Sequence, residues 1–409
     1  MRRIKILVIF FLFVFLIFSM GDNPSGWSIA KEKEAYPHLE LLAKVIATIQ
    51  QKYVGEVEVE KLIIDALEGM VSSLDPYSQF MTPDVKKEME LETKGEFGGV
   101  GMVITRRDDI ITVVSPIEDT PAFRAGIQSE DKIVEIDGEP TKGWTTWQAA
   151  KKLRGEPGSQ VTIKVRREGE KDLLTFELTR EIIHIKSVKN VRIIKDDIGY
   201  IRITAFREDT AKNLREALTQ LLEQGANSLI LDVRNNPGGL LDVAVEVADE
   251  FLPKGKLIVF IKGREGKEER KYFSRNDPIF PHGHKVVILI NKGSASASEI
   301  VAGTLKKSGI ATLVGTDTFG KGSVQSIIGL DDKYALRLTT AHYYIDEDKT
   351  IEGEGIKPDI EVEISKEERA KILEALEGYK KEDIPDPQLE KAIEYLTEPE
   401  IPKTVDSTQ

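Results

Sequence analysis

Hydrophobic residues near the N-terminus recur at helical spacing and predict two amphipathic segments. The first set comprises Leu39, Leu42, Ile46, Ile49 and Tyr53, and the second, after Gly55, comprises Leu62, Ile63, Ala66, Leu67 and Met70. Steps of three and four residues place each set on one face of a helix. Such apolar stripes need a partner. We therefore expect residues 22–94 to form a helical cap, whose stripes serve either simple packing or assembly into a homodimer.

Between residues 95 and 180 the hydrophobic pattern changes to short β-rich runs separated by turns. Runs of this kind predict strands. The expected strands cover residues 110–114, 132–136, 161–166 and 173–178, and one helix covers residues 145–153. This region is expected to be a small β-rich domain with short helices.

From Gly199 onward the pattern alternates between strand and helix. Residues 200–203 are β-like, residues 210–223 have one apolar helical face, and residues 228–233 form an apolar strand. Further strands are expected at residues 257–261, 285–290 and 311–314, and a helix at residues 298–305. This βαβ order predicts a largely parallel sheet covered on both faces. The chain is thus a multidomain α/β protein, with a core over residues 181–365 and a charged helical tail over residues 366–409.

The first 21 residues differ from the rest and predict export. Arg2, Arg3 and Lys5 precede an apolar stretch over residues 6–18, which is typical of a secretory signal peptide. The stretch is short for a spanning helix, which needs roughly 20 residues. Residues 18–21 make a poor cleavage site, so membrane anchoring through residues 4–20 stays open. We expect an extracytoplasmic protein, on the periplasmic or cell-envelope side.

Charge and cysteine content exclude several classes of function. A formal net charge of −12 over 409 residues, with no basic stripe, argues against nucleic acid as a partner. The chain has no cysteine, which excludes disulfides, thiolate catalysis and cysteine metal sites. No metal or other cofactor is expected.

Small residues surround Ser296 at the predicted turn between strand 285–290 and the following helix. Backbone N–H groups at such a turn are available to an oxyanion. Lys321 is the candidate base, and a Ser–Lys pair can perform acyl transfer without histidine. Free lysine has a pKa of about 10.4, so this role requires an apolar site that lowers it. In an extended segment Gln325 shares a face with Lys321 and would hold it by a hydrogen bond.

A second loop follows strand 228–233 and ends in the paired glycines Gly238 and Gly239. Without side chains, these residues let the backbone approach a substrate closely. Both this loop and the Ser296 turn follow the carboxyl ends of predicted parallel strands, where such sheets place their sites.

A glycine-rich stretch opens the small β-rich domain and comprises Gly98, Gly99, Val100, Gly101 and Met102. Such a loop offers consecutive N–H groups to a carboxylate, and an exposed strand edge accepts a peptide by β-addition. Together with residues 115–127 and 131–138, this stretch resembles a PDZ domain, which we assign to residues 95–180.

The motifs of the whole chain, in their order, resemble the carboxyl-terminal processing protease family, also called tail-specific proteases. The resemblance runs from about residue 39 to residue 362 and rests on five motifs outside the PDZ region. These motifs lie at residues 74–76, 231–239, 293–299, 319–322 and 355–359.

The resemblance implies a role for each site residue and a core similar to the crotonase/Clp-protease-like fold. Ser296 corresponds to the family's nucleophile, Lys321 to its base and Gln325 to the glutamine four residues on. The N–H groups of Gly239 and Ala297 correspond to the oxyanion hole.

The expected function is that of an exported serine endopeptidase whose PDZ domain captures the free C-terminus of a protein or peptide substrate. The alternative is a non-enzymatic PDZ scaffold that binds exported proteins. Arg154 follows the expected helix 145–153, and its guanidinium could fork onto an acceptor in the core and couple tail binding to the site. An exposed arginine favoured by the helix dipole is an equally good interpretation.

Other chemistry fits the sequence less well. Ser294 and Ser298 also lie in the turn, and Ser298 is expected to be a helix N-cap. Residues 315–321 nearly match a P-loop, but Gly322 stands where Ser or Thr is needed. A Ser–His triad could draw on His282, His284 or His342, and a metal site on the first two, but each histidine fits a surface or packing role better.

Overall fold

The computed structural model describes residues 29–398, except residues 108–109, 118–119, 129, 145, 282, 347–349 and 377–383. The predicted signal peptide or anchor lies outside the described residues. Within the described part, no helix has both the length and the hydrophobicity needed to cross a membrane. The chain divides into two compact units, Met1–Pro76 and Tyr77–Gln409.

The first unit contains the two helices that the hydrophobic spacing predicts. They are α2 (Ile29–Lys52) and α3 (Val59–Ser72). Leu39 and Met70 expose 58% and 60% of their surfaces, so these apolar stripes remain open in the monomer. Both helices are confirmed, whereas their use as a cap or a dimerisation element stays a prediction.

The second unit begins with β1 (Gln79–Met81) and α4 (Pro83–Lys94), which lead into a β-rich domain. Its main sheet has the order β3-β4-β5-β7-β8, and β6 pairs with β5. The strands are β3 (Met102–Arg107), β4 (Ile110–Pro116), β5 (Lys132–Ile136), β6 (Glu139–Pro140), β7 (Gln160–Arg166) and β8 (Leu174–Thr179), and the helices are α5 (Pro121–Arg124) and α6 (Thr146–Leu153). Ile111, Ile133 and Ile163 are fully buried in its core.

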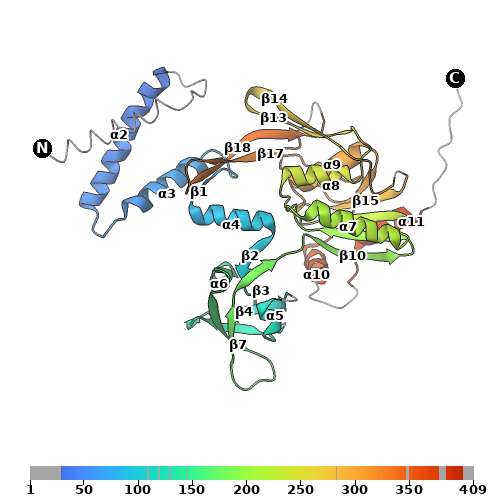
Figure 1. Cartoon of the computed structure of the whole chain (residues 1–409), viewed down its shortest axis with the longest axis horizontal. Helices are drawn as coiled ribbons and strands as arrows, with labels where there is room; N and C mark the ends of the chain where they lie inside the picture. The colour runs from blue at the N-terminus through green and yellow to red at the C-terminus, as the bar shows by residue number, and fades with distance from the viewer. Residues whose placement is uncertain are drawn as a thin grey trace. The chain divides into compact units, whose positions relative to one another are not determined.

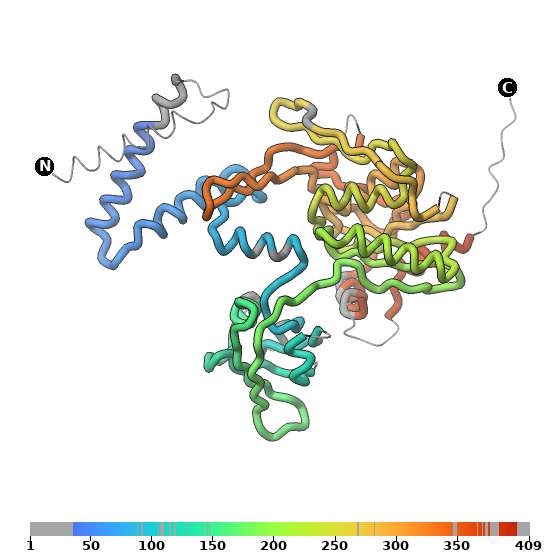
Figure 2. The backbone as a smooth tube through the Cα atoms, in the orientation of Figure 1, coloured from blue at the N-terminus to red at the C-terminus, as the bar shows by residue number. Residues whose placement is uncertain are grey.

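A two-stranded ribbon carries the chain into and out of this β-rich domain. The incoming strand β2 (Glu96–Gly99) pairs antiparallel with the outgoing strand β9 (Glu181–His184). Figure 2 shows them side by side, in cyan and green. The strands and the helix that the sequence predicts for residues 95–180 are present as β4, β5, β7, β8 and α6.

The core is built on a six-stranded sheet of order β10-β11-β12-β15-β16-β19, parallel from β11 onward. Its strands are β10 (Val188–Lys195), β11 (Ile198–Ile203), β12 (Ser228–Asp232), β15 (Lys285–Ile290), β16 (Ala311–Gly315) and β19 (Ile360–Glu361). One apolar cluster joins the sheet to α7 (Thr210–Glu223), α8 (Leu241–Asp249) and α9 (Ala297–Lys307). A second joins the opposite face to α11 (Pro387–Thr397). Figure 1 labels β10 and β15 of this sheet and the helices α7, α8, α9 and α11. The predicted parallel sheet with two covered faces is confirmed.

Residues 257–261 do not belong to the parallel sheet, contrary to the pattern expected for the core. They lie in β13 (Leu257–Lys262), which forms a hairpin with β14 (Glu268–Phe273) and also pairs with β18 (Ala335–Tyr344). β17 (Ser323–Gly329) and β1 pair with β18 in the same antiparallel sheet. A turn over residues 263–267 returns the chain directly, and such a tight turn can only join antiparallel strands.

The tail contains two described helices, α10 (Lys366–Leu376) and α11. Ala392 and Leu396 of α11 pack against Tyr200, Val287 and Leu289 of the sheet. The charged tail of the sequence prediction therefore includes an amphipathic helix that completes the core.

Candidate active site

Ser296 lies at the junction of β15 and α9, where the backbone adopts an unusual conformation. Its φ of 54° and ψ of −114° are strained for a residue with a Cβ. Such strain costs about 1–3 kcal/mol and persists only where the surroundings enforce it. Ser296 is partly exposed, whereas its neighbours Ala295 and Ala297 are buried. The turn therefore holds Ser296 at a partly exposed position between two buried residues.

The other two serines of the turn are bound internally. Ser294 Oγ donates to the Val233 carbonyl at 2.8 Å and accepts the N–H of Asn291 at 3.1 Å. Ser298 Oγ donates to the Asn236 carbonyl at 2.9 Å. Both residues are fully buried, and their hydroxyls join the Ser296 turn to Val233 and to Asn236 of the 234–239 loop.

The prediction that Ser298 caps the helix is wrong, because α9 begins at Ala297 and Ser296 is its N-cap. The Glu299 carboxylate accepts the N–H of Ser296 at 2.8 Å and thereby starts the helix earlier. A serine followed three residues later by glutamate is the sequence signature of a capping box.

Glu299 joins the serine turn to the lysine loop. Oε2 accepts the N–H of Lys321 at 2.9 Å as well as that of Ser296. Oε1 accepts the N–H of Gly320 at 2.7 Å and the hydroxyl of Thr318 at 2.6 Å. Glu299 is fully buried, and this burial raises the pKa of its carboxyl despite the four hydrogen bonds. One buried carboxylate thus sets the relative position of two distant segments.

Tyr343 of β18 makes a second link between these segments. Its hydroxyl donates to the Lys321 carbonyl and lies 3.3 Å from the Ser296 carbonyl. Burial, with the nearby Glu299 carboxyl, raises the pKa of Tyr343 well above its usual value. Sequence reasoning singled out neither Glu299 nor Tyr343. The Ser-x-x-Glu spacing could have identified the first, but nothing in the local sequence marks Tyr343.

The side chains of Lys321 and Gln325 lie near different partners. Lys321 Nζ is 4.5 Å from the centre of the Tyr77 ring, a cation–π contact. Gln325 Nε2 donates to Ser323 Oγ at 3.0 Å and to Thr339 Oγ1 at 3.4 Å. The expected hydrogen bond from Gln325 to Lys321 stays a prediction.

The paired glycines bring the 234–239 loop against the Ser296 turn. A Cβ on Gly238 would lie 2.8 Å from Ser296 Cβ and 2.9 Å from Ala297 N. Gly239 has a φ of 150°, and a Cβ there would lie 2.1 Å from the Phe206 carbonyl oxygen. Ala297 is the first residue of α9, so its N–H has no intrahelical acceptor. This geometry requires glycine at both positions.

Hydrogen bonds of the Asn236 backbone and side chain hold the 234–239 loop close to the Ser296 turn. Its carbonyl accepts the N–H of Ala295 at 3.0 Å, and its Oδ1 accepts the N–H of Gly238 at 2.9 Å. Its Nδ2 donates to the Ile203 carbonyl at 2.9 Å. The two loops therefore meet in one hydrogen-bonded unit.

The glycine-rich stretch of the β-rich domain is packed tightly. Gly98 and Gly99 pair with β9, and a Cβ on Gly98 would lie 2.1 Å from the Gly155 carbonyl oxygen. Gly101 has a φ of 76°, and its carbonyl accepts the Thr120 hydroxyl at 2.9 Å. Val100 is buried and leads through Gly101 into β3, which begins at Met102. β3 is a terminal strand of the described sheet, at the end opposite β8, and such an edge can accept a peptide strand.

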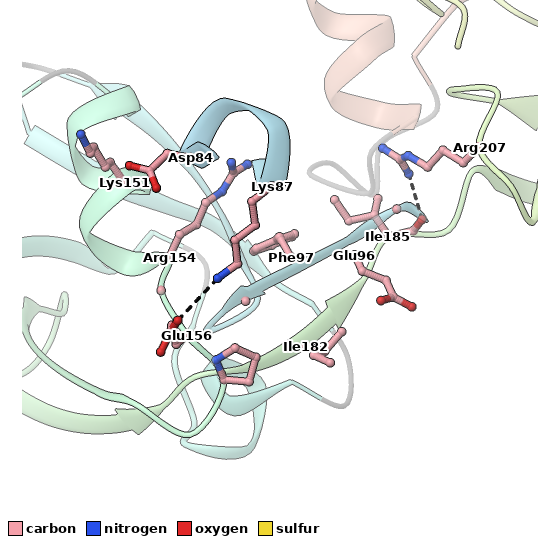
Figure 3. Close-up of a pocket in the computed structure, with 14 residues that line it drawn as sticks. Asp84, Lys87, Glu96, Phe97, Lys151, Arg154, Glu156, Ile182, Ile185 and Arg207 are labelled. Atoms are coloured by element: carbon pink, nitrogen blue, oxygen red, sulfur yellow. Dashed lines mark hydrogen bonds and ion pairs between the residues drawn. The ribbon is translucent and has the colours of Figure 1, made fainter. Parts of the chain in front are cut away.

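Arg154 lines a pocket of about 460 Å³ beside the β2–β9 ribbon (Figure 3). Its guanidinium carbon lies 5.0 Å from the centre of the Phe97 ring. Across this pocket Lys87 Nζ reaches Glu156 at 3.5 Å, and Arg207 donates to the Ile185 carbonyl at 2.9 Å. The predicted coupling of Arg154 to an acceptor in the core stays a prediction.

The candidate histidines occupy separate surroundings. His284 packs edge-on against Phe280, with ring centres 5.4 Å apart. His342 Nδ1 lies 3.9 Å from Glu352. His282 lies outside the described residues. In the part of the chain that the structure describes, no group of three or more His, Cys, Asp or Glu residues could hold a metal ion.

Comparisons with family models match three segments of the chain. Residues 197–362 match peptidase family S41, and residues 112–167 match a PDZ domain. Residues 23–85 match the N-terminal domain of the activating protease CtpB.

Two curated relatives are similar over most of their length. A carboxy-terminal-processing protease of Bartonella bacilliformis is 41% identical, covering 87% of this chain and 82% of its own. A protein of Staphylococcus epidermidis named as a probable CtpA-like serine protease is 35% identical, covering 83% and 69%. Among solved structures, a Bacteroides fragilis protein named as a putative S41 protease is 18% identical, with a TM-score of 0.54 and coverage of 86% of this chain and 96% of its own. This last likeness concerns the fold alone.

Proposed function

Because the chain belongs to the carboxyl-terminal processing protease family and is a serine-type peptidase, we propose that Ser296 and Lys321 form its catalytic dyad. The observation that carries this proposal is the Glu299 carboxylate, which accepts the N–H groups of both residues. A buried charge with four hydrogen bonds gives a rigid frame, which a dyad needs in order to keep its geometry.

In the proposed reaction Ser296 Oγ attacks the scissile carbonyl while Lys321 Nζ takes its proton. The tetrahedral oxyanion is held by the N–H groups of Gly239 and Ala297. The C–N bond then breaks, and Lys321 passes the proton to the leaving amine. Water, deprotonated by the same lysine, hydrolyses the acyl-enzyme and restores Ser296. Gln325 is assigned to orienting Lys321.

The PDZ domain is assigned to capture of the substrate's free C-terminus. β3 offers the strand edge, and the stretch Gly98 to Met102 offers backbone groups near its start. We further propose that the protein works outside the cytoplasm, exported or anchored by its N-terminal segment, and that α2 and α3 support a homodimer. The crotonase/Clp-protease-like classification of the core belongs to the same proposal.

The test of this function is mass spectrometry of the products released from β-casein, an unstructured protein. Wild-type enzyme is expected to cleave it and to slow markedly when the casein C-terminus is amidated. Ser296→Ala is expected to release no products while retaining the wild-type melting temperature. Cleavage by Ser296→Ala would reject the dyad, and equal rates on both caseins would reject C-terminal capture.

The pH dependence of the rate gives an independent check. A general base must be unprotonated, so activity is expected to rise with pH as Lys321 loses its proton. We expect the midpoint to lie well below the value of about 10.4 for free lysine. A midpoint unchanged from that of free lysine would argue for another base.

A further inference from the structure

The guanidinium of Arg234 is buried at the start of the loop that ends in Gly239. Arg234 is 3% exposed and lies two residues after Asp232, the last residue of β12. Asp232 binds one side of it, with 3.0 Å from Nε to Oδ1 and 2.7 Å from Nη2 to Oδ2. Asp232 is itself held by the Tyr200 hydroxyl at 2.7 Å. This side of Arg234 is therefore fixed to the sheet.

The other side of the guanidinium is bound by the C-terminal segment. Asp386 accepts from Nη1 at 2.9 Å and from Nη2 at 2.8 Å. Gln388 Oε1 accepts from Nη1 at 3.0 Å, and Gln388 Nε2 donates to the Val362 carbonyl at 2.8 Å. Both residues are buried at the start of α11. With Asp232, they give each guanidinium nitrogen at least one acceptor.

Arg234 begins the segment that positions the proposed oxyanion donors. The next residue, Asn235, donates its N–H to Asn291 Oδ1 at 2.9 Å. Asn236 then bonds to Ala295 and Ser298 in the nucleophile turn. A shift of Arg234 would pass through this short segment to Gly238 and Gly239. Oxyanion donors act only when they point at the developing charge, so their position affects the rate strongly.

We propose that Asp386 and Gln388 are positioning residues for the Gly239 loop and act on it through Arg234. The helix α11 lies beyond the region that matches peptidase family S41, which ends at residue 362. On this proposal the C-terminal helix is part of the apparatus that orients the oxyanion hole. The inference rests on the proposed function, because it assigns Gly239 as an oxyanion donor.

The apolar face of α11 provides a separate attachment to the core. Ala392 and Leu396 pack in the cluster on the outer face of the sheet. The Tyr395 hydroxyl accepts a hydrogen bond from Thr312 Oγ1 at 2.9 Å. Apolar packing alone can hold a helix against a sheet. A buried ion pair often contributes less to the stability of a protein than apolar residues of similar volume would. The ionic end of α11 therefore has a use beyond docking, which is to fix Arg234.

The experiment compares Asp386→Ala with Tyr395→Phe in the full chain. Tyr395→Phe removes a polar contact of the same helix without touching Arg234. We measure kcat and KM on a fluorogenic peptide built from a cleavage site mapped in β-casein, and inhibition by the corresponding peptide aldehyde. The aldehyde adds to Ser296 and places an oxyanion in the hole. Both variants are assayed at a temperature at which they are folded.

For Asp386→Ala we expect kcat to fall about 10- to 100-fold with KM unchanged, because a small misplacement of donors weakens transition-state binding. Aldehyde affinity should fall by a similar factor. Tyr395→Phe should keep the wild-type kcat and aldehyde affinity. A wild-type kcat in Asp386→Ala, or an equal loss in Tyr395→Phe, would overturn the positioning role.

If Asp386→Ala does not fold, the comparison is made with Asp386→Asn. This variant keeps the side-chain shape and one acceptor oxygen, and a loss of kcat of several-fold is expected because the bidentate bond is lost. An unchanged kcat in Asp386→Asn would overturn the proposal. Ser296→Ala separates the two levels of inference. If it still cleaves, the proposed function fails, whereas if it is inactive and Asp386→Ala behaves like Tyr395→Phe, only the role of α11 fails.

Discussion

Two stretches rich in small residues, the Ser296 turn and the Gly98 to Met102 stretch, are held in different ways, as their proposed tasks of catalysis and peptide capture would require. The Ser296 turn is bound from several sides by buried groups, including the Glu299 carboxylate and the Ser294 and Ser298 hydroxyls. The second stretch is held by close packing of glycines and leads to an open strand edge. Chemistry requires preorganised groups, whereas peptide addition requires unpaired backbone. The same residue types therefore support rigidity in one place and access in the other.

The largest effects are expected from removing the side chains of the proposed dyad, Ser296 in its turn and Lys321 in the neighbouring loop. Lys321→Ala should lower peptide hydrolysis by at least about 10³-fold, as should Ser296→Ala, because the two residues act as one unit. The double variant should be no slower than either single one. Steady-state kinetics on the fluorogenic peptide test this, and multiplicative losses in the double variant would contradict a dyad.

Glu299→Gln tests whether the buried carboxylate makes this turn rigid. An amide NH₂ cannot accept hydrogen bonds, so one pair of the four donors bound by Glu299 would lose its acceptor. We expect kcat to fall about 10- to 100-fold, in line with the loss of precise positioning. The matched control is Glu250→Gln, whose buried carboxylate is bound by Arg215 at 2.7 Å. Glu250→Gln should lower the stability of the protein but keep its kcat. Equal losses of kcat in the two variants would refute the role of Glu299 in holding the Ser296 turn and the Lys321 loop in position.

Alanine at two glycines compares the two stretches directly. Gly239→Ala would place a Cβ against the Phe206 carbonyl, and Gly101→Ala would place one 2.2 Å from Thr120 Cβ. Gly239→Ala should abolish most hydrolysis of a short peptide. Gly101→Ala should leave that hydrolysis within about twofold, because it does not alter the oxyanion hole, and should weaken binding of a C-terminal peptide. Calorimetric binding and peptide kinetics on both variants measure the contrast, and a reversed pattern would show that the two tasks are not separated as described.

Ser294→Ala and Ser298→Ala test the assignment of Ser296 as the nucleophile among the three serines of the turn. Each removes a buried hydroxyl that binds a backbone carbonyl, so the free energy of unfolding should fall by about 1–3 kcal/mol. The rate per folded molecule should remain within several-fold of wild type. Denaturant unfolding and active-site titration measure the two quantities separately. Loss of activity without loss of stability in Ser294→Ala would point to the wrong nucleophile.

Arg154→Ala should give the smallest effect and tests whether the two regions communicate. If Arg154 couples tail binding to the site, turnover of a protein substrate should change several-fold while the affinity for an isolated C-terminal peptide stays constant. Casein kinetics and peptide calorimetry on the same variant test this. Unchanged turnover would leave Arg154 as a residue that packs on Phe97.

The sequence by itself determined the type and order of most elements. The apolar steps of α2, α3 and α7, and the continuous apolar runs of β12 and β15, depend on local periodicity, which is visible without the fold. The same holds for the position of Ser296 at a strand-to-helix turn. The glycines of the 234–239 loop were also visible, because only glycine tolerates such close backbone contact.

Only the tertiary structure decided which distant groups meet. It placed β13 in the antiparallel sheet, brought Tyr343 to the Lys321 carbonyl, and set Asp386 against Arg234. It also made Glu299 the shared acceptor of the Ser296 turn and the Lys321 loop, and it placed the N-cap of α9 at Ser296 instead of Ser298. Local patterns report which face of an element is apolar, but the partner of a buried polar group depends on long-range packing. Such a group is costly to bury without a partner, and the complete fold supplies it.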